Sequence, residues 1–134
     1  MNETFLTNWK SQIKKGTLSF IILNILKEDE YYGYELIEKI RKHTEIEIAE
    51  GTLYPLMNRL KNENLVNSKW IEQETGIPRK YYCLTEIGLK SINQMNEYWE
   101  NLEESIIKLL GFSCPVTVFA KSSIFSPFIL ILKY

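Results

Sequence analysis

The sequence predicts an α+β fold that is mainly α, and three features of the 134-residue chain support this prediction. Apolar residues recur at helical spacing in three successive segments of the first half. Two β-prone segments follow, separated by turn-forming residues, and a long amphipathic stretch follows them. This order predicts a winged helix-turn-helix domain over residues 1–84 and a long C-terminal dimerisation helix over 85–110.

The spacing of apolar residues places the three short helices. Residues 8–27 predict the first, whose segment LSFIILNIL (18–26) is apolar nearly all round and should be buried on more than one side. After a turn at 31–33, residues 34–42 predict the second helix and 44–48 a connector. Residues 50–62 predict the third, because Leu53, Leu56, Met57 and Leu60 stand at i, i+3, i+4 and i+7.

A hairpin and a long helix complete the predicted fold. Residues 65–73 and 80–84 are β-prone, and the turn-forming segment ETGIP (74–78) joins them. Thr85 is a favourable N-cap for a helix over 86–110, although Gly88 stands where a capping box has Glu or Gln. At about 1.5 Å per residue this helix is roughly 35 Å long, too long for a small winged domain to cover, so we expect a homodimer. The predicted seam has the coiled-coil spacing 3, 4, 3, 4, 3 and consists of Ile92, Met95, Trp99, Leu102, Ile106 and Leu109.

Several classes of function are disfavoured by the residues present. Cys83 and Cys114 lie far apart and His43 is the only histidine, so we expect neither a metal site nor a disulfide, and a cytoplasmic location. We expect no cofactor and no catalytic residues, because no nucleophile triad or phosphate loop is present, and Glu103 and Glu104 point apart on a helix. We also expect no secretory signal at the N-terminus and no membrane span in residues 1–110.

The net charge of −1 conceals an uneven distribution. Residues 5–27 carry four lysines and no acid, and residues 76–85 carry only Arg79 and Lys80, whereas 86–110 carry five glutamates against two lysines. Cations that bind DNA phosphates can therefore be concentrated in one region of an otherwise balanced chain.

Four segments together resemble the PadR family of transcriptional regulators: YYGYEL (31–36), EGTLYPL (50–56), RL (59–60) and PRKYYCLT (78–85). The resemblance covers residues 16–105, and the compact form is similar to the short-tailed, multidrug-responsive branch of that family. It implies a homodimeric repressor of double-stranded operator DNA. The alternative is a winged-helix adaptor that binds another protein and has no ligand response.

The resemblance implies a set of DNA-facing residues, and the start of a helix suits a phosphate oxygen. Alternatively, Gly51 only makes a turn and Tyr54 packs on the first helix; Lys14 and Lys15 are weaker candidates for phosphate contacts. The predicted DNA-facing residues are Tyr32, Glu50, Gly51, Thr52 and Tyr54 from the helix-turn-helix, with Arg79 and Lys80 from the wing.

The resemblance further implies that Trp99 stacks on a planar aromatic ligand across the dimer axis and that Trp9 packs on the partner subunit. An aromatic at helical spacing is more usually part of a core, and this alternative stays open. Asn96 stands where the resemblance implies an aromatic residue. The other residues of the implied cavity are Ser19, Phe20, Leu23, Asn24, Ile92, Met95, Asn96 and Glu103.

Residues 111–134 form an atypical apolar tail with no acid and two prolines. Three interpretations stay open: a strap on the dimer, a contact with a membrane surface, or a sequence without selected function.

Overall fold

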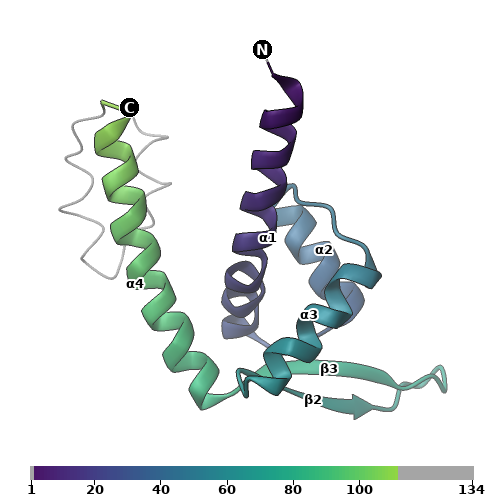
Figure 1. The fold of residues 1–134 in the computed structure, drawn as a ribbon. Helices are drawn as coiled ribbons and strands as arrows, with labels where there is room; N and C mark the ends of the chain where they lie inside the picture. The colour runs from purple at the N-terminus through teal and green to yellow at the C-terminus, as the bar shows by residue number, and fades with distance from the viewer. Residues whose placement is uncertain (1, 112–134) are drawn as a thin grey trace, which may run out of the picture. The chain divides into compact units, whose positions relative to one another are not determined.

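The structure is a computed structural model that describes residues 2–111 (Figure 1). It divides into two compact units, Met1–Gln94 and Met95–Tyr134, with the boundary inside the last helix. The predicted tail of residues 111–134, with Cys114, lies outside the described residues except for Gly111. The elements in chain order are α1 (Glu3–Glu28), β1 (Tyr31–Tyr32), α2 (Gly33–Thr44), α3 (Glu50–Asn62), β2 (Val66–Ile71), β3 (Arg79–Leu84) and α4 (Glu86–Leu109).

Helix α1 begins earlier than the apolar pattern predicts. It starts at Glu3 rather than near residue 8, because the side chain of Asn2 accepts a hydrogen bond from the Phe5 amide at 3.2 Å and caps the first turn. Burial is confined to its second half, where Leu18, Ile22, Leu23, Ile25 and Leu26 enter the core. The apolar all-round segment is therefore buried as predicted, whereas the first half of α1 is exposed.

The core of the first unit is formed where α1, α2, α3 and the sheet meet (Figure 1). Leu53, Met57 and Leu60 of α3 are buried as predicted, and Leu56 is half-buried at the edge of the same stripe. Burial of one such side chain contributes about 1.5–3 kcal/mol. The buried stripe of Leu53, Met57 and Leu60 fixes the rotation of α3 about its axis and leaves the opposite face of the helix exposed. The remaining core positions are Leu36, Ile40, Val66, Tyr82 and Ile92.

The sheet has three strands in the order β1-β3-β2, whereas the sequence predicted a two-stranded hairpin. The prediction of a turn at 31–33 was wrong, because Tyr31 pairs with Tyr82 and Tyr32 with Tyr81 in an antiparallel ladder. A two-residue strand is too short to show alternation, so only its pairing with β3 defines it. As a result, Tyr32 lies beside the hairpin and at the start of α2.

The predicted hairpin is confirmed, with β2 and β3 paired from Val66 and Leu84 to Ile71 and Arg79. Gly76 has a positive φ of 81° in the connecting turn, a conformation that other residues adopt at a cost. The turn leaves Arg79 and Lys80 at the start of β3.

The predicted N-cap of α4 is also confirmed. The Thr85 hydroxyl accepts a hydrogen bond from the Gly88 amide at 2.9 Å and donates to the carbonyl oxygen of Asn64 at 2.6 Å. Gly88 itself is pressed against the chain, because a Cβ at this position would overlap the carbonyl oxygen of Leu65. The close approach of these backbones explains why this helix start has a glycine where a capping box has Glu or Gln.

Candidate nucleic-acid interface

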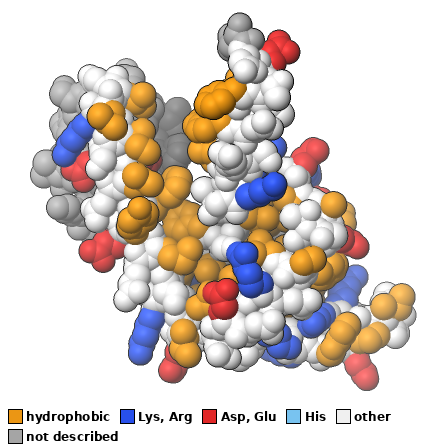
Figure 2. All heavy atoms as spheres, in the orientation of Figure 1, with side chains coloured by type: hydrophobic (Ala, Val, Ile, Leu, Met, Phe, Trp, Pro, Cys, Tyr) orange, Lys and Arg blue, Asp and Glu red, His pale blue; other side chains and the backbone are white. Residues whose placement is uncertain are grey.

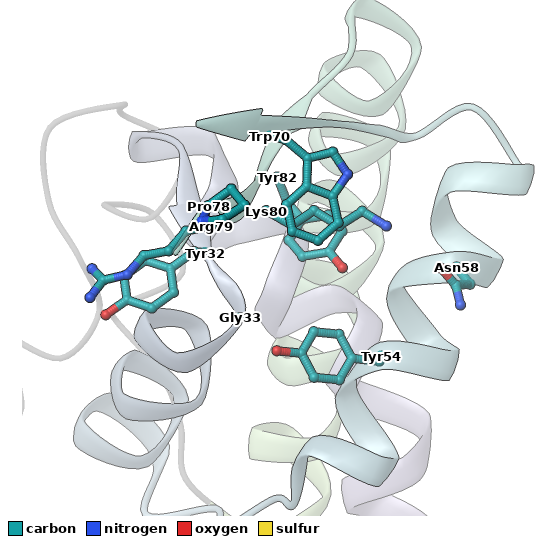
Figure 3. A pocket seen from close by; sticks show the side chains of 9 residues that line it. All are labelled: Tyr32, Gly33, Tyr54, Asn58, Trp70, Pro78, Arg79, Lys80 and Tyr82. Atoms are coloured by element: carbon teal, nitrogen blue, oxygen red, sulfur yellow. The ribbon is translucent and has the colours of Figure 1, made fainter. Parts of the chain in front are cut away.

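A hollow of about 420 Å³ lies in the first unit, between the start of α2, the exposed face of α3 and the hairpin (Figure 3). Four aromatic side chains and two cations contribute to its walls, and none of the described residues that line it is acidic. Its lining residues are Tyr32, Gly33, Tyr54, Asn58, Trp70, Pro78, Arg79, Lys80 and Tyr82.

The predicted residues of α3 lie on its exposed face. Glu50, Gly51 and Thr52 form the exposed first turn outside the hollow, and Tyr54 enters the hollow. Gly51 is helical, and apart from its chain neighbours and the adjacent backbone of its own helix no described atom lies within 4 Å of where its Cβ would be. Gly51 thus lies in the first turn of the helix, and the space beside it is open to another molecule.

Tyr54 contacts the start of α2, and Figure 3 shows its ring beside Gly33. The hydroxyl oxygen of Tyr54 lies 2.6 Å from the position that a Cβ of Gly33 would occupy. The side chain remains 39% exposed, so it is held in place without being removed from solvent.

Two cation–π contacts hold the cations of the hairpin near aromatic rings. The guanidinium of Arg79 lies 4.5 Å from the ring centre of Tyr32, and the ammonium of Lys80 lies 5.9 Å from that of Trp70. Within residues 2–111 neither Arg79 nor Lys80 forms an ion pair with a carboxylate. Their side chains therefore lie against aromatic rings rather than against carboxylates, an arrangement that leaves both available to bind an external anion.

Tyr82 forms part of the hollow although it is only 1% exposed. Burial raises the pKa of its phenol above the ordinary value, and the nearby Tyr54 adds a smaller effect in the same direction. Tyr82 is therefore a neutral phenol at physiological pH.

Sequence reasoning missed five residues of the hollow: Gly33, Asn58, Trp70, Pro78 and Tyr82. Asn58 could have been found from its position one turn after Tyr54, and Trp70 from its hairpin pairing with Lys80. Lys14 and Lys15 are exposed on α1 and do not line the hollow.

The residues implied for a ligand cavity are divided between the two units. Ser19, Phe20, Leu23, Asn24 and Ile92 belong to the first unit, and the rest to the second. Leu23 and Ile92 are fully buried within one chain, so neither has surface left for a ligand or a second subunit. In the second unit, a cavity of about 210 Å³ is lined by Trp99, Leu102, Glu103, Ile106 and Ile107, while Met95 and Asn96 are half-buried.

No helix among residues 2–111 is long and apolar enough to cross a membrane. The same residues contain no cluster of three metal-ligating side chains.

Comparisons with known proteins agree with this geometry. A family model described as the transcriptional regulator PadR-like family matches residues 22–94. The structure is similar to a PadR-like transcription factor of Bacteroides fragilis, with 38% identity, a TM-score of 0.65, and coverage of 76% of this chain and 98% of that one. A PadR family regulator of Eggerthella lenta is 34% identical with a TM-score of 0.71, over 81% of this chain and 94% of that one.

Among curated proteins, the Escherichia coli transcriptional regulator YqjI is 34% identical over 93 residues, which are 68% of this chain. The match spans 43% of the length of that relative. Regulators of this family bind DNA and are not enzymes. The match over more than half of the sequence, together with the winged-helix fold, shows that the chain belongs to the PadR-like family of transcriptional regulators.

Proposed function

We propose that this PadR-like regulator is a homodimeric repressor that releases its operator when a planar aromatic molecule binds at the dimer interface. The observation that carries the DNA-binding part is the acid-free hollow, in which Arg79 and Lys80 lie beside the exposed face of α3.

In this proposal α3 enters the major groove and the hairpin follows the adjacent backbone and minor groove. The first-turn amides and Thr52 approach a phosphate, since a helix start is partly positive. Glu50 is exposed on the same turn, where a carboxylate would repel a phosphate but can accept a hydrogen bond from a cytosine amino group. Tyr32, beneath Arg79, is in a position to donate its hydroxyl to a phosphate.

Exposed apolar side chains support the homodimer. Figure 2 shows hydrophobic side chains on the exposed part of α1 and, separately, along α4. Trp9 is 49% and Trp99 40% exposed, and stripes of this length on one chain are typical of an interface. The side chains of these stripes are Phe5, Leu6, Trp9 and Ile13 on α1, and Trp99, Leu102, Ile106 and Leu109 on α4.

The cavity beside Trp99 supports the ligand. Its walls are almost entirely apolar apart from Glu103, so it suits a flat aromatic molecule with a positive charge. Because Leu23 and Ile92 are buried, we assign ligand contacts to Trp99, Glu103, Met95 and Asn96 rather than to those two.

A hydrogen bond between helices supports coupling of ligand and DNA. Arg59 of α3 donates from Nη2 to the hydroxyl of Ser19 on α1, at 3.1 Å. A movement of α1 in a ligand-bound dimer would therefore reach the DNA-contacting helix. A ligand can shift this equilibrium only by binding more tightly to the form that does not fit DNA.

The test is a mobility-shift titration of the purified protein on its own upstream DNA, with its mass determined in solution. We expect a dimer and a saturable shift that excess nonspecific DNA competes away only weakly. A well-folded monomer that binds no DNA at low salt would overturn the proposal and favour the protein-binding adaptor.

Ligand response is tested by quenching of tryptophan fluorescence with planar cationic dyes. We expect quenching that is lost in Trp99→Ala but kept in Trp70→Ala, because Trp70 lies in the hollow and not in the α4 cavity. The same dyes should release bound DNA. Quenching without release would separate ligand binding from regulation.

A further inference from the structure

We propose that Asn58 contacts an adenine base in the major groove and sets the sequence preference at that position of each half-site. This inference rests on the proposed entry of α3 into DNA and adds to it the residue that selects a base. The inference is supported by the position of Asn58 and by the hydrogen bonds that neighbouring polar side chains of α3 form within the chain.

Two other long polar side chains of α3, those of Arg59 and Lys61, already have partners within the chain. Arg59 donates to Ser19 at 3.1 Å, and Lys61 donates to the Ser68 hydroxyl at 2.7 Å. Both are thus held by α1 and β2 respectively. Within the described residues no hydrogen bond or ion pair involves the Asn58 side chain, and it is exposed.

Burial of the opposite face directs Asn58 outward. Met57, one residue before Asn58, and Leu60, two residues after it, are 0% and 2% exposed, so α3 cannot rotate about its axis without exposing them. Tyr54, one turn earlier, is held against Gly33, and Figure 3 shows Asn58 following Tyr54 along the same helix. An amide at this place therefore projects from the middle of the helix face that lines the hollow.

The chemistry of an amide selects adenine among the four bases. The Asn58 nitrogen can donate to adenine N7 while its oxygen accepts from the adenine N6 amino group. Guanine presents two acceptors at the same edge, and cytosine and thymine present one hydrogen-bonding group each, so none of the three forms this pair. A phosphate could also accept from the amide, and that contact would carry no base preference.

The first experiment uses the unmodified protein. A preferred operator is selected from a random DNA pool, and each adenine of one half-site is replaced singly by 7-deazaadenine, which lacks the N7 acceptor. We expect one position at which the replacement weakens binding by about 5-fold, the low end of the range for a bidentate base contact, because the N6 amino group can still donate.

The second experiment compares Asn58→Ala with Asn62→Ala. Asn62 is the matched control, because it is exposed on the same helix but does not line the hollow. Asn58→Ala removes both hydrogen bonds, so it should bind the natural operator about 5- to 150-fold more weakly, no longer respond to the 7-deazaadenine, and accept other bases there. The slope of log affinity against log salt should be unchanged, because no phosphate contact is removed. Asn62→Ala should keep the full preference, and thermal unfolding of both variants should match the unmodified protein.

Each outcome decides a different point. If the unmodified protein binds no DNA, the proposed function itself fails. If it binds but no adenine position responds to loss of N7, the assignment of Asn58 to adenine is overturned. If Asn58→Ala weakens binding equally on all sequences, Asn58 contacts the backbone and the proposal is again overturned.

Discussion

The phenol of Tyr54 occupies the space that a side chain at position 33 would need, since its hydroxyl oxygen lies 2.6 Å from the Cβ that any other residue would place there. Tyr54 belongs to α3 and Gly33 to the start of α2, so this contact sets the position of a side chain that we propose faces DNA by a residue far from it in sequence. Tyr54 therefore packs against α2, whereas the alternative from the sequence had it pack on the first helix, and it remains 39% exposed.

Gly33→Ala is expected to displace the Tyr54 ring and weaken operator binding by about tenfold, equivalent to roughly 1.4 kcal/mol. The exposed ring can move toward solvent, so the free energy of unfolding should change little. Mobility shift and urea denaturation measure the two effects. Gly16→Ala is the control, because no described atom lies near its Cβ position, and it should leave DNA binding intact. Unchanged binding by Gly33→Ala would remove Tyr54 from the interface.

Gly88→Ala is expected to destabilise the winged domain by about 1–3 kcal/mol, the usual cost of overpacking. The added methyl group would overlap the backbone oxygen of Leu65 and lie 2.8 Å from a methyl carbon of Leu84. A backbone oxygen held by the Thr85 amide at 3.1 Å cannot move aside as a side chain can. Urea denaturation measures the change, and Gly16→Ala again provides the control. A stabilised Gly88→Ala protein would contradict the close packing of this helix start.

Replacing both wing cations, in Arg79→Gln/Lys80→Gln, is expected to lower the slope of log affinity against log salt by about one to two units. Each cation that contacts a phosphate releases counterions, and each lost contact removes about 0.9 from the slope. Titrations at several salt concentrations measure it. The control Lys90→Gln/Lys108→Gln removes the same charge from α4. If both double variants change the slope equally, the wing cations act only through net charge.

Alkaline stability should depend on Tyr82, because burial raises the pKa of its phenol in the folded state. The unfolded chain then loses this proton first, so the stability due to Tyr82 is complete below pH of about 10 and decreases as pH rises through the folded-state pKa. Urea denaturation from pH 7 to pH 11 should show a smaller alkaline loss in Tyr82→Phe than in the unmodified protein. Tyr98→Phe, at an exposed position, should follow the unmodified protein. Parallel curves for all three would exclude this role of Tyr82.

The sequence by itself determined the features that depend on near neighbours. The stripe of Leu53, Met57 and Leu60 predicted α3 and its buried face, because a helix repeats every 3.6 residues. The segment 74–78 predicted the hairpin turn, Thr85 the start of α4, and Arg79 and Lys80 the cations of the wing. Each of these signals lies within a few residues of the structure that it specifies.

Only the tertiary structure decided which distant residues meet. The pairing of Tyr31 and Tyr32 with β3 adds a third strand and brings Tyr32 beneath Arg79, although the two residues form no local pattern. Ile92 continues the heptad spacing of α4 yet is buried in the winged domain, since periodicity gives the face of a helix and not its partner. The proposal that Asn58 contacts a base likewise depends on tertiary contacts, because Ser19 of α1 and Ser68 of β2 bind its neighbours Arg59 and Lys61. Contacts between residues far apart in sequence depend on how the helices and strands pack together, and the spacing of residues within one element does not specify that packing.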